Sequence, residues 1–154
     1  MNPGDMKLSI LAIGAHPDDV ELGCGGTILS QRALGNTVGI LDLTRGELGT
    51  RGNAELRLKE ADAAAKVLGV SVRENLLLED GFIRNDKESQ LKLIQVIRKY
   101  RPDVVLCNAL KDRHPDHGEA SELARDAVFL SGLRKIETLN ENEAQEPWRP
   151  KAVS

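Results

Sequence analysis

Short apolar runs alternate along this chain with longer segments in which apolar residues recur at helical spacing. The runs at 7–15, 38–43 and 103–107 have the length and composition of strands buried in a parallel sheet, and the more polar segment 72–78 (VRENLLL) gives a further strand. After each run, apolar side chains recur every three or four residues, which predicts four amphipathic helices. Alternation of strand and helix predicts an α/β fold with a mostly parallel sheet and right-handed crossovers.

Capping and helix-breaking residues mark the ends of the predicted helices. The first helix begins near Asp19, and Asn53 and Gly69 can cap the two ends of the second. The third ends before Pro102, because the residue before a proline disfavours helical backbone, and the fourth ends at Gly132. The first helix contains three glycines, which are Gly23, Gly25 and Gly26. We expect these glycines to allow close packing of the helix on the sheet.

Two clusters of polar residues follow predicted strands. HPDD (16–19) comes directly after the strand at 7–15, and HPDH (114–117) comes soon after the strand at 103–107. In such a sheet the strand order is commonly 3-2-1-4, which makes the first and fourth strands neighbours where the winding reverses. Ligands bind at that point, beyond the carboxyl ends of the strands. We therefore expect the two clusters to meet at one edge of the sheet.

All three histidines of the chain lie in these two clusters. Two imidazoles and one carboxylate form a common zinc-binding set in hydrolases, with one coordination position left open for water or substrate. We assign the ligands as His16, Asp19 and His117. The same set also suits Fe(II), as in non-haem iron oxygenases, so Fe2+ or another divalent metal is an alternative to Zn2+.

The remaining polar residues of the clusters can carry the proton transfers. Asp18 is left free to act as general base on a water that the metal activates. His114 would face the developing oxyanion and later protonate a leaving amine, and Asp116 would hold the His114 imidazole in the correct tautomer. Taken alone, Asp18 or Asp19 could be only a helix N-cap, and the second cluster could be only a polar turn.

The sequences AHPDD (15–19) and HPDH (114–117) resemble the LmbE-like, or PIG-L, family of zinc-dependent deacetylases. The resemblance runs over residues 7–134 and implies a Rossmann-like three-layer sandwich. It also implies an enzyme that removes an acetyl group from an N-acetylglucosamine conjugate, with metal-activated water. The roles that it implies for the two clusters are those assigned above.

The polar segment 46–57 (GELGTRGNAELR) resembles the substrate loop of that family. Arg57 matches an arginine that in bacillithiol-pathway members is expected to contact the malate part of the substrate, and a guanidinium suits a carboxylate. The alternative for this residue is an ion pair with Glu60 on the same helix face. Glu47 and Arg51 are further candidates for substrate contact. The pattern is most like the subgroup that deacetylates N-acetylglucosaminyl malate in bacillithiol biosynthesis.

Family members normally continue past the position at which this chain ends. We therefore expect residues 1–154 to form a single LmbE-like domain, the N-terminal catalytic part, truncated before the family's C-terminal segment. Residues 149–153 (RPKAV) echo residues 101–105 (RPDVV) at the start of the fourth strand, which predicts that a fifth strand begins there. Metal ligands would remain in such a shortened chain, whereas substrate contacts from the missing part would not.

Composition and charge restrict the class of protein. With 154 residues, 40% hydrophobic and 29% charged, the chain has the size and composition of one globular domain. A net charge of -3 and scattered basic residues give no sign of a nucleic-acid-binding surface. Cys24 and Cys107 indicate free thiols in a reducing compartment. Since no signal peptide or long apolar segment is evident, we expect a cytoplasmic protein without membrane attachment.

Two other functions compete with the hydrolase. A nucleotide-binding module could use Asp42, at the end of the second strand, as a ribose-binding acid, but the turn after the first strand lacks the GxGxxG fingerprint. A non-catalytic metal-binding or assembly protein is the other alternative. The resemblance implies a small N-acetyl amino sugar conjugate as substrate and a homo-oligomer as the assembly.

Overall fold

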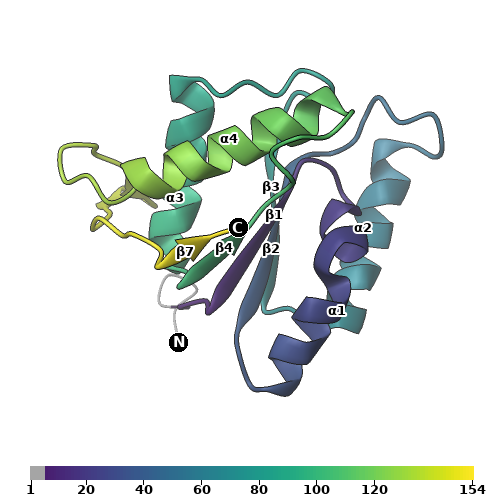
Figure 1. The fold of residues 1–154 in the computed structure, drawn as a ribbon, viewed down its shortest axis with the longest axis horizontal. Coiled ribbons are helices and arrows are strands. Elements are labelled where there is room, and N and C mark those ends of the chain that lie inside the picture. Colours follow the sequence, from purple (N-terminus) through teal and green to yellow (C-terminus); the bar gives the residue numbers. More distant parts are fainter. Residues whose placement is uncertain (1–5) are drawn as a thin grey trace.

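Parallel strands form the central sheet of the computed structural model, which describes residues 6–154 (Figure 1). In chain order, the strands of this sheet are β1 (Ile10–Gly14), β2 (Val38–Thr44), β3 (Val72–Leu78), β4 (Val104–Leu106) and β7 (Ala152–Val153). Their order across the sheet is β3-β2-β1-β4-β7, and each neighbouring pair is parallel. The predicted 3-2-1-4 order is confirmed, and so is the fifth strand, since β7 pairs with β4.

Helices cover both faces of this sheet, which gives the expected three-layer α/β fold. The helices are α1 (Asp19–Ala33), α2 (Ala54–Leu68), α3 (Lys87–Tyr100) and α4 (Pro115–Leu130). In Figure 1, α1 and α2 lie on one face and α3 and α4 on the other. Asn53 and Gly69 cap α2 as predicted, through a side-chain acceptor and a left-handed backbone respectively. Within residues 6–154, no helix is long and apolar enough to cross a membrane.

Alternation along β1 divides the core between the two layers. Leu11 and Ile13 pack in the cluster that contains the apolar residues of α3 and α4, whereas Ile10 and Ala12 pack with Val20 and other residues of the α1 side. Successive side chains of a strand point to opposite faces, so a strand between two helical layers must be apolar on both. This requirement explains why the run reads as continuously hydrophobic. It also leaves the carboxyl end of β1 as the place where polar residues can begin.

The glycines of α1 do not have the role expected from sequence. A Cβ atom added at Gly23, Gly25 or Gly26 would meet no neighbouring atom within 4 Å among the described residues. Close packing on the sheet is therefore the wrong explanation. The helix is instead interrupted at Cys24, whose φ of -145° and ψ of 20° are not helical. Glycines on both sides lower the helix propensity there, which fits an interruption at this position.

A short hairpin of β5 (Leu139–Asn140) and β6 (Glu143–Ala144) was not predicted. Each strand has only two residues, which is too short to produce a periodic pattern. The turn residues Glu141 and Asn142 both have positive φ, as tight hairpin turns require. The predicted free thiols Cys24 and Cys107 are confirmed, and both are half-buried.

A buried guanidinium joins α3 to the segment that follows α4. Arg98 is only 4% exposed, and it donates hydrogen bonds to the backbone carbonyls of Ser131, Leu133 and Ile136 and to the hydroxyl of Thr138. Burial lowers the pKa of Arg98. The carbonyls after a helix end have no partner within the helix, so one planar side chain with several donors can satisfy a group of them.

Candidate functional site

The two histidine clusters lie side by side at the carboxyl end of the parallel strands. His16 lies between β1 and α1, and His114 is the N-cap residue of α4. The His16 and His114 ring centroids are 4.7 Å apart, and those of His114 and His117 are 4.8 Å apart. Their expected convergence at one edge of the sheet is confirmed, although most of the sequence separates them.

The spacing of three side chains fits a tetrahedral metal ion. The Asp19 Oδ2 atom lies 3.4 Å from His16 Nδ1 and 3.3 Å from His117 Nε2, and the three ligand atoms all lie within 4.8 Å of one another. Donor atoms around a tetrahedral zinc ion with bonds of about 2.0 Å are separated by about 3.3 Å. His16, Asp19 and His117, which we call the metal triad, therefore have the ligand chemistry of a divalent-metal site, and both distances from Asp19 match tetrahedral spacing.

Two buried carboxylates support the first histidine of the metal triad from behind. His16 Nε2 lies 3.0 Å from Asp80 Oδ1 and 2.9 Å from Asp116 Oδ2. A ring nitrogen that donates to a carboxylate fixes the tautomer and leaves the other nitrogen free for a metal. The Nδ1 atom of His16 is therefore the one available toward Asp19 and His117.

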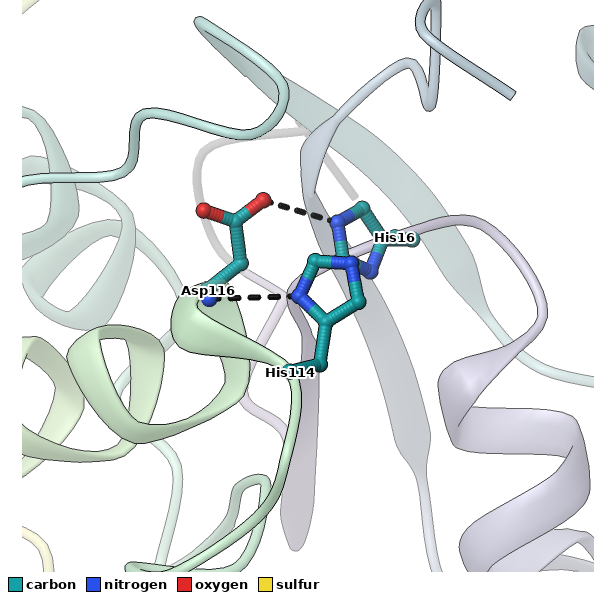
Figure 2. Close-up of side chains that lie close together, drawn as sticks. All are labelled: His16, His114 and Asp116. Carbon is teal, nitrogen blue, oxygen red and sulfur yellow. Dashed lines mark hydrogen bonds and ion pairs between the residues drawn. The ribbon is translucent and has the colours of Figure 1, made fainter. Parts of the chain in front are cut away.

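Asp116 does not orient His114 in the way that the sequence suggested. Figure 2 shows its carboxylate directed at His16, while its backbone N–H donates to His114 Nδ1 at 3.2 Å. The carboxylate also accepts the N–H groups of Gly81 and Ile83, so its oxygens are already engaged in the interior. The expected carboxylate contact to His114 is wrong, because Asp116 points inward from the first turn of α4. The backbone N–H of Asp116, in the first turn of α4, donates a hydrogen bond to His114 Nδ1 instead. The proton of the neutral His114 ring is then on Nε2.

The electrostatics of His16 follow from this arrangement. Burial by itself lowers the pKa of His16, but hydrogen bonds to Asp19 and Asp116 and the charges of Asp19 and Asp80 outweigh it, and the pKa is raised from 6.5 to about 9. Burial raises the pKa of Asp19, but its hydrogen bonds with His16 and the charge of His117 outweigh this, and the pKa is lowered. In the metal-free protein, His16 is therefore protonated at neutral pH and a metal must displace that proton.

We predict that the metal-free protein loses stability as pH rises from 6.5 to 9. A raised pKa in the folded state contributes stability that is present in full below pH 6.5 and disappears as pH rises through about 9. A shift of this size corresponds to about 3 kcal/mol. Urea unfolding in the presence of a chelator measures the loss, and His16→Gln, which cannot be protonated, should remove most of the slope. A wild-type free energy of unfolding that does not change between these pH values contradicts the prediction.

Asp18 and Asp19 point in different directions, as their proposed roles require. The Asp18 side chain is 59% exposed, whereas that of Asp19 is 13% exposed. Asp18 occupies the N-cap position of α1, yet its side chain makes no capping hydrogen bond within the described part of the chain. Burial raises the pKa of Asp18, against the opposing charge of Arg57. A carboxylate with a raised pKa that is not engaged in capping suits a proton acceptor.

The backbone of Asp18 is strained. Its φ of 113° lies in the left-handed region that residues with a side chain rarely adopt. Such a conformation costs on the order of 1–3 kcal/mol and persists only where the surrounding structure enforces it. Gly14 contributes to this tight turn, since a Cβ there would lie 3.1 Å from the Asp19 Cβ atom.

Arg57 connects the polar loop at 44–52 to the AHPDD turn. It donates to the carbonyl oxygens of Gly46 and Pro17, each at 3.0 Å, and its Nη2 atom lies 3.5 Å from Asp18 Oδ2. The alternative ion pair with Glu60 is not formed among the described residues. Arg57 is thus brought to the site, but it already donates two hydrogen bonds to backbone carbonyls.

The two other candidate substrate residues lie in the same loop and differ in their contacts. Glu47 accepts the backbone N–H of Asp80 at 3.2 Å, and the N–H of Leu48 donates to Asp80 Oδ2 at 2.8 Å. The loop is therefore joined to the carboxylate that supports His16. Arg51 is exposed, and no contact within residues 6–154 joins it to the site.

Asp80 and Asn108 are among the side chains at this edge that sequence reasoning missed. Asp80 follows β3 and contacts His16, and Asn108 follows β4 and bridges two segments. The Asn108 Oδ1 atom accepts the N–H of Ala15 at 2.9 Å, and its Nδ2 atom donates to Asp19 Oδ2 at 3.2 Å. Both follow strands that end at the edge where ligands were expected, so position after a strand was the signal that could have identified them.

The chain is similar in sequence to proteins of one family. A model of the family PIG-L, described as GlcNAc-PI de-N-acetylase, matches residues 11–128, a range that includes both clusters. A diacetylchitobiose deacetylase of Thermococcus kodakarensis is 36% identical over 139 residues, which are 84% of this chain and 52% of that protein. A 4-oxalmesaconate hydratase of Pseudomonas putida is 33% identical over 143 residues, which are 84% of this chain and 55% of that protein.

A solved structure agrees closely with the fold. The crystal structure of a conserved protein from Thermus thermophilus superposes with a TM-score of 0.88 and 46% sequence identity, over 95% of this chain and 64% of that one. The chain spans about half the length of the first two curated relatives, with 52% and 55% of their residues matched.

Proposed function

This chain belongs to the PIG-L family, and we propose that it carries the catalytic part of a metal-dependent N-deacetylase that acts on an N-acetylglucosamine conjugate. The observation that carries the proposal is the metal triad with Asp18 and His114 beside it, at the carboxyl edge of the sheet. A diacetylchitobiose deacetylase among the relatives supports the reaction class. A nucleotide-binding role has less support, because both carboxylate oxygens of Asp42, the candidate ribose-binding acid, accept hydrogen bonds from Arg73.

Zinc is the metal that we propose, on the basis of two nitrogen ligands and one oxygen ligand at tetrahedral spacing. A zinc ion held there would polarise the amide carbonyl of the substrate and lower the pKa of a water molecule. His16 is held for this role by Asp80 and Asp116, so its metal-facing nitrogen is fixed before any ion binds. Fe2+ or another divalent ion with the same geometry is the alternative.

Asp18 and His114 would move the protons of the reaction. Asp18 would accept a proton from the attacking water, whose oxygen forms a bond to the acetyl carbon. His114 carries its proton on Nε2, because its Nδ1 atom accepts a hydrogen bond from the N–H of Asp116. The Nε2–H group would donate a hydrogen bond to the developing oxyanion. The C–N bond then breaks as Asp18 passes the proton that it took from water to the amine nitrogen, while the Nε2–H group of His114 stays on the oxyanion. Acetate and a free amino sugar are the products.

Our specific candidate substrate is N-acetylglucosaminyl malate, as in bacillithiol biosynthesis. Its support is the resemblance of the loop that contains Glu47, Arg51 and Arg57, together with the preference of guanidinium groups for carboxylates. Arg57 already donates to two backbone carbonyls, so we assign it first to holding this loop over the site. Exposed Arg51 is the freer cation for an anionic aglycone. The assembly that we propose is a homo-oligomer, from the resemblance alone.

An acetate-release assay tests the function. The zinc-loaded protein is incubated with N-acetylglucosaminyl malate, diacetylchitobiose and free N-acetylglucosamine, and acetate and the free amine are measured together. We expect both products in equal amounts from at least one conjugate, and loss of metal and of product in His117→Ala. The parallel arm offers 4-oxalmesaconate, because one relative is a hydratase. Hydration in that arm without acetate release in the first would overturn the deacetylase proposal.

A further inference from the structure

One carboxylate in the loop before α4 contacts both histidines of the HPDH cluster. The Asp112 Oδ2 atom lies 2.9 Å from the ring Nδ1 atom of His117. Its Oδ1 atom accepts the backbone N–H of His114 at 3.0 Å. Asp112 thus bridges the ring of one histidine and the backbone of the other.

The contact with His117 determines which ring nitrogen faces the metal triad. His117 Nε2 lies 3.3 Å from Asp19 Oδ2, and Asp112 contacts Nδ1, the other nitrogen of the ring. A carboxylate can only accept here, so the Nδ1 atom must carry the proton. The lone pair of Nε2 is then directed toward Asp19 and His16, as metal binding requires.

We propose that Asp112 is a positioning residue for the metal site, which selects the Nδ1–H tautomer and the ring orientation of His117. The proposal rests on the metal-binding part of the proposed function and is independent of the substrate. Carboxylates behind a metal-ligating histidine raise the basicity of the ligand and hold its orientation, and their loss typically weakens metal affinity 10- to 100-fold.

The two histidine ligands differ in how many carboxylates hold them. We therefore expect the loss of Asp112 to affect His117 more than the loss of one carboxylate affects His16. His16 Nε2 has two acceptors, Asp80 and Asp116, whose side chains are 7% and 2% exposed. His117 Nδ1 has one acceptor among residues 6–154, and the Asp112 side chain is 35% exposed. Removal of one carboxylate at His16 leaves a second in place, whereas removal of Asp112 leaves His117 Nδ1 to water.

A simpler role in helix capping does not explain the contacts of Asp112. His114 is the N-cap residue of α4, and its own ring accepts the N–H of Asp116. The Oδ1 atom of Asp112 accepts instead from the residue two positions ahead, in the manner of an Asx-turn. Its second oxygen, Oδ2, contacts His117 Nδ1, and helix capping does not account for that contact.

Two substitutions separate the contact with the turn from the contact with the ring. Asp112→Ser keeps a short side-chain acceptor for the His114 N–H but cannot reach His117, and Asp112→Ala removes both contacts. Zinc affinity is measured by competition with a chromophoric chelator. The protonation of His117 Nδ1 and Nε2 is read from ring 15N shifts in the metal-free protein. Asp126→Ala is the matched control, because Asp126 is a carboxylate of α4 that accepts from Asn85 at 2.8 Å.

We expect both Asp112 variants to bind zinc 10- to 100-fold more weakly than wild type and to lose the preference for Nδ1–H at His117, while Asp126→Ala changes neither. Zinc affinity within twofold of wild type, with unchanged His117 shifts, would overturn the proposal. Retained affinity in Asp112→Ser alone would also overturn it, because the turn contact would then be sufficient. A wild-type protein that binds zinc but releases no acetate would contradict the deacetylase and leave this inference standing.

Discussion

Asp18→Asn should lower the rate of acetate release about 100-fold or more while the protein keeps its metal. Asparagine has nearly the same shape as aspartate, but its amide oxygen cannot hold the proton of the attacking water. Asp18 lies outside the metal triad, and its side chain is largely exposed, so metal binding has no need of it. Steady-state rates and zinc content measured on the same preparation test both parts of the prediction.

The neighbouring carboxylate provides a matched comparison. Asp19→Asn changes a ligand whose Oδ2 atom faces both His16 and His117, so this variant should lose both the metal and the activity. Loss of metal in Asp18→Asn, or unchanged activity in a variant with full metal content, would contradict the roles given to the two residues.

Asp18→Gly adds a test of backbone strain at the same position. Glycine adopts positive φ without steric cost, so relief of the strain at Asp18 should raise the free energy of unfolding by about 1 kcal/mol even though activity is lost. Urea unfolding of the metal-free forms of Asp18→Gly and Asp18→Asn isolates the backbone effect. Equal stability of the two variants would show that the turn is not strained.

Arg98→Met should lower the free energy of unfolding by about 3 kcal/mol, the scale for breaking a buried hydrogen-bond network. Methionine fills much of the same space but leaves the carbonyls of Ser131, Leu133 and Ile136 without the donors they now have. These contacts lie at the end of α4 that is farthest from His114 and His117. The zinc affinity of the folded protein should therefore stay within about twofold of wild type. Urea unfolding in chelator provides the measurement.

Arg149→Met is the control for this substitution. Arg149 also donates to a carbonyl near the end of α4, that of Phe129 at 3.0 Å, but this contact is exposed. Water replaces an exposed donor, so the cost should stay below about 1 kcal/mol. Equal losses in the two variants would mean that burial of Arg98 is not the cause.

Hydrophobic pattern and topology were sufficient to predict most of the fold. β1 (Ile10–Gly14) and β4 (Val104–Leu106) contain no polar side chain, so a parallel sheet with helices on both faces was the consistent solution. The general position of ligand sites in such sheets then placed both clusters at one edge. Neither step required knowledge of side-chain conformation.

The errors concern side-chain direction, which spacing does not determine. Asp116 was expected to orient His114 because the two residues are close in sequence, yet helix geometry turns its carboxylate toward His16 and the N–H groups of Gly81 and Ile83. The contacts of Asp80 and Asn108 join segments far apart in sequence, so no local pattern could reveal them. Likewise, the purpose of the α1 glycines depended on which atoms surround them.

The metal triad takes its ligands from distant parts of the chain. His117 lies next to Asp116 in sequence, and Asp116, which contacts His16, is 100 positions away from it. An ion held by both His16 and His117 would act as a removable cross-link between the β1–α1 turn and the start of α4. By mass action, free zinc at 100 times its dissociation constant would add about 2.7 kcal/mol to the free energy of unfolding. The melting temperature of this protein would then report its metal occupancy, and removal of the ion would lower it.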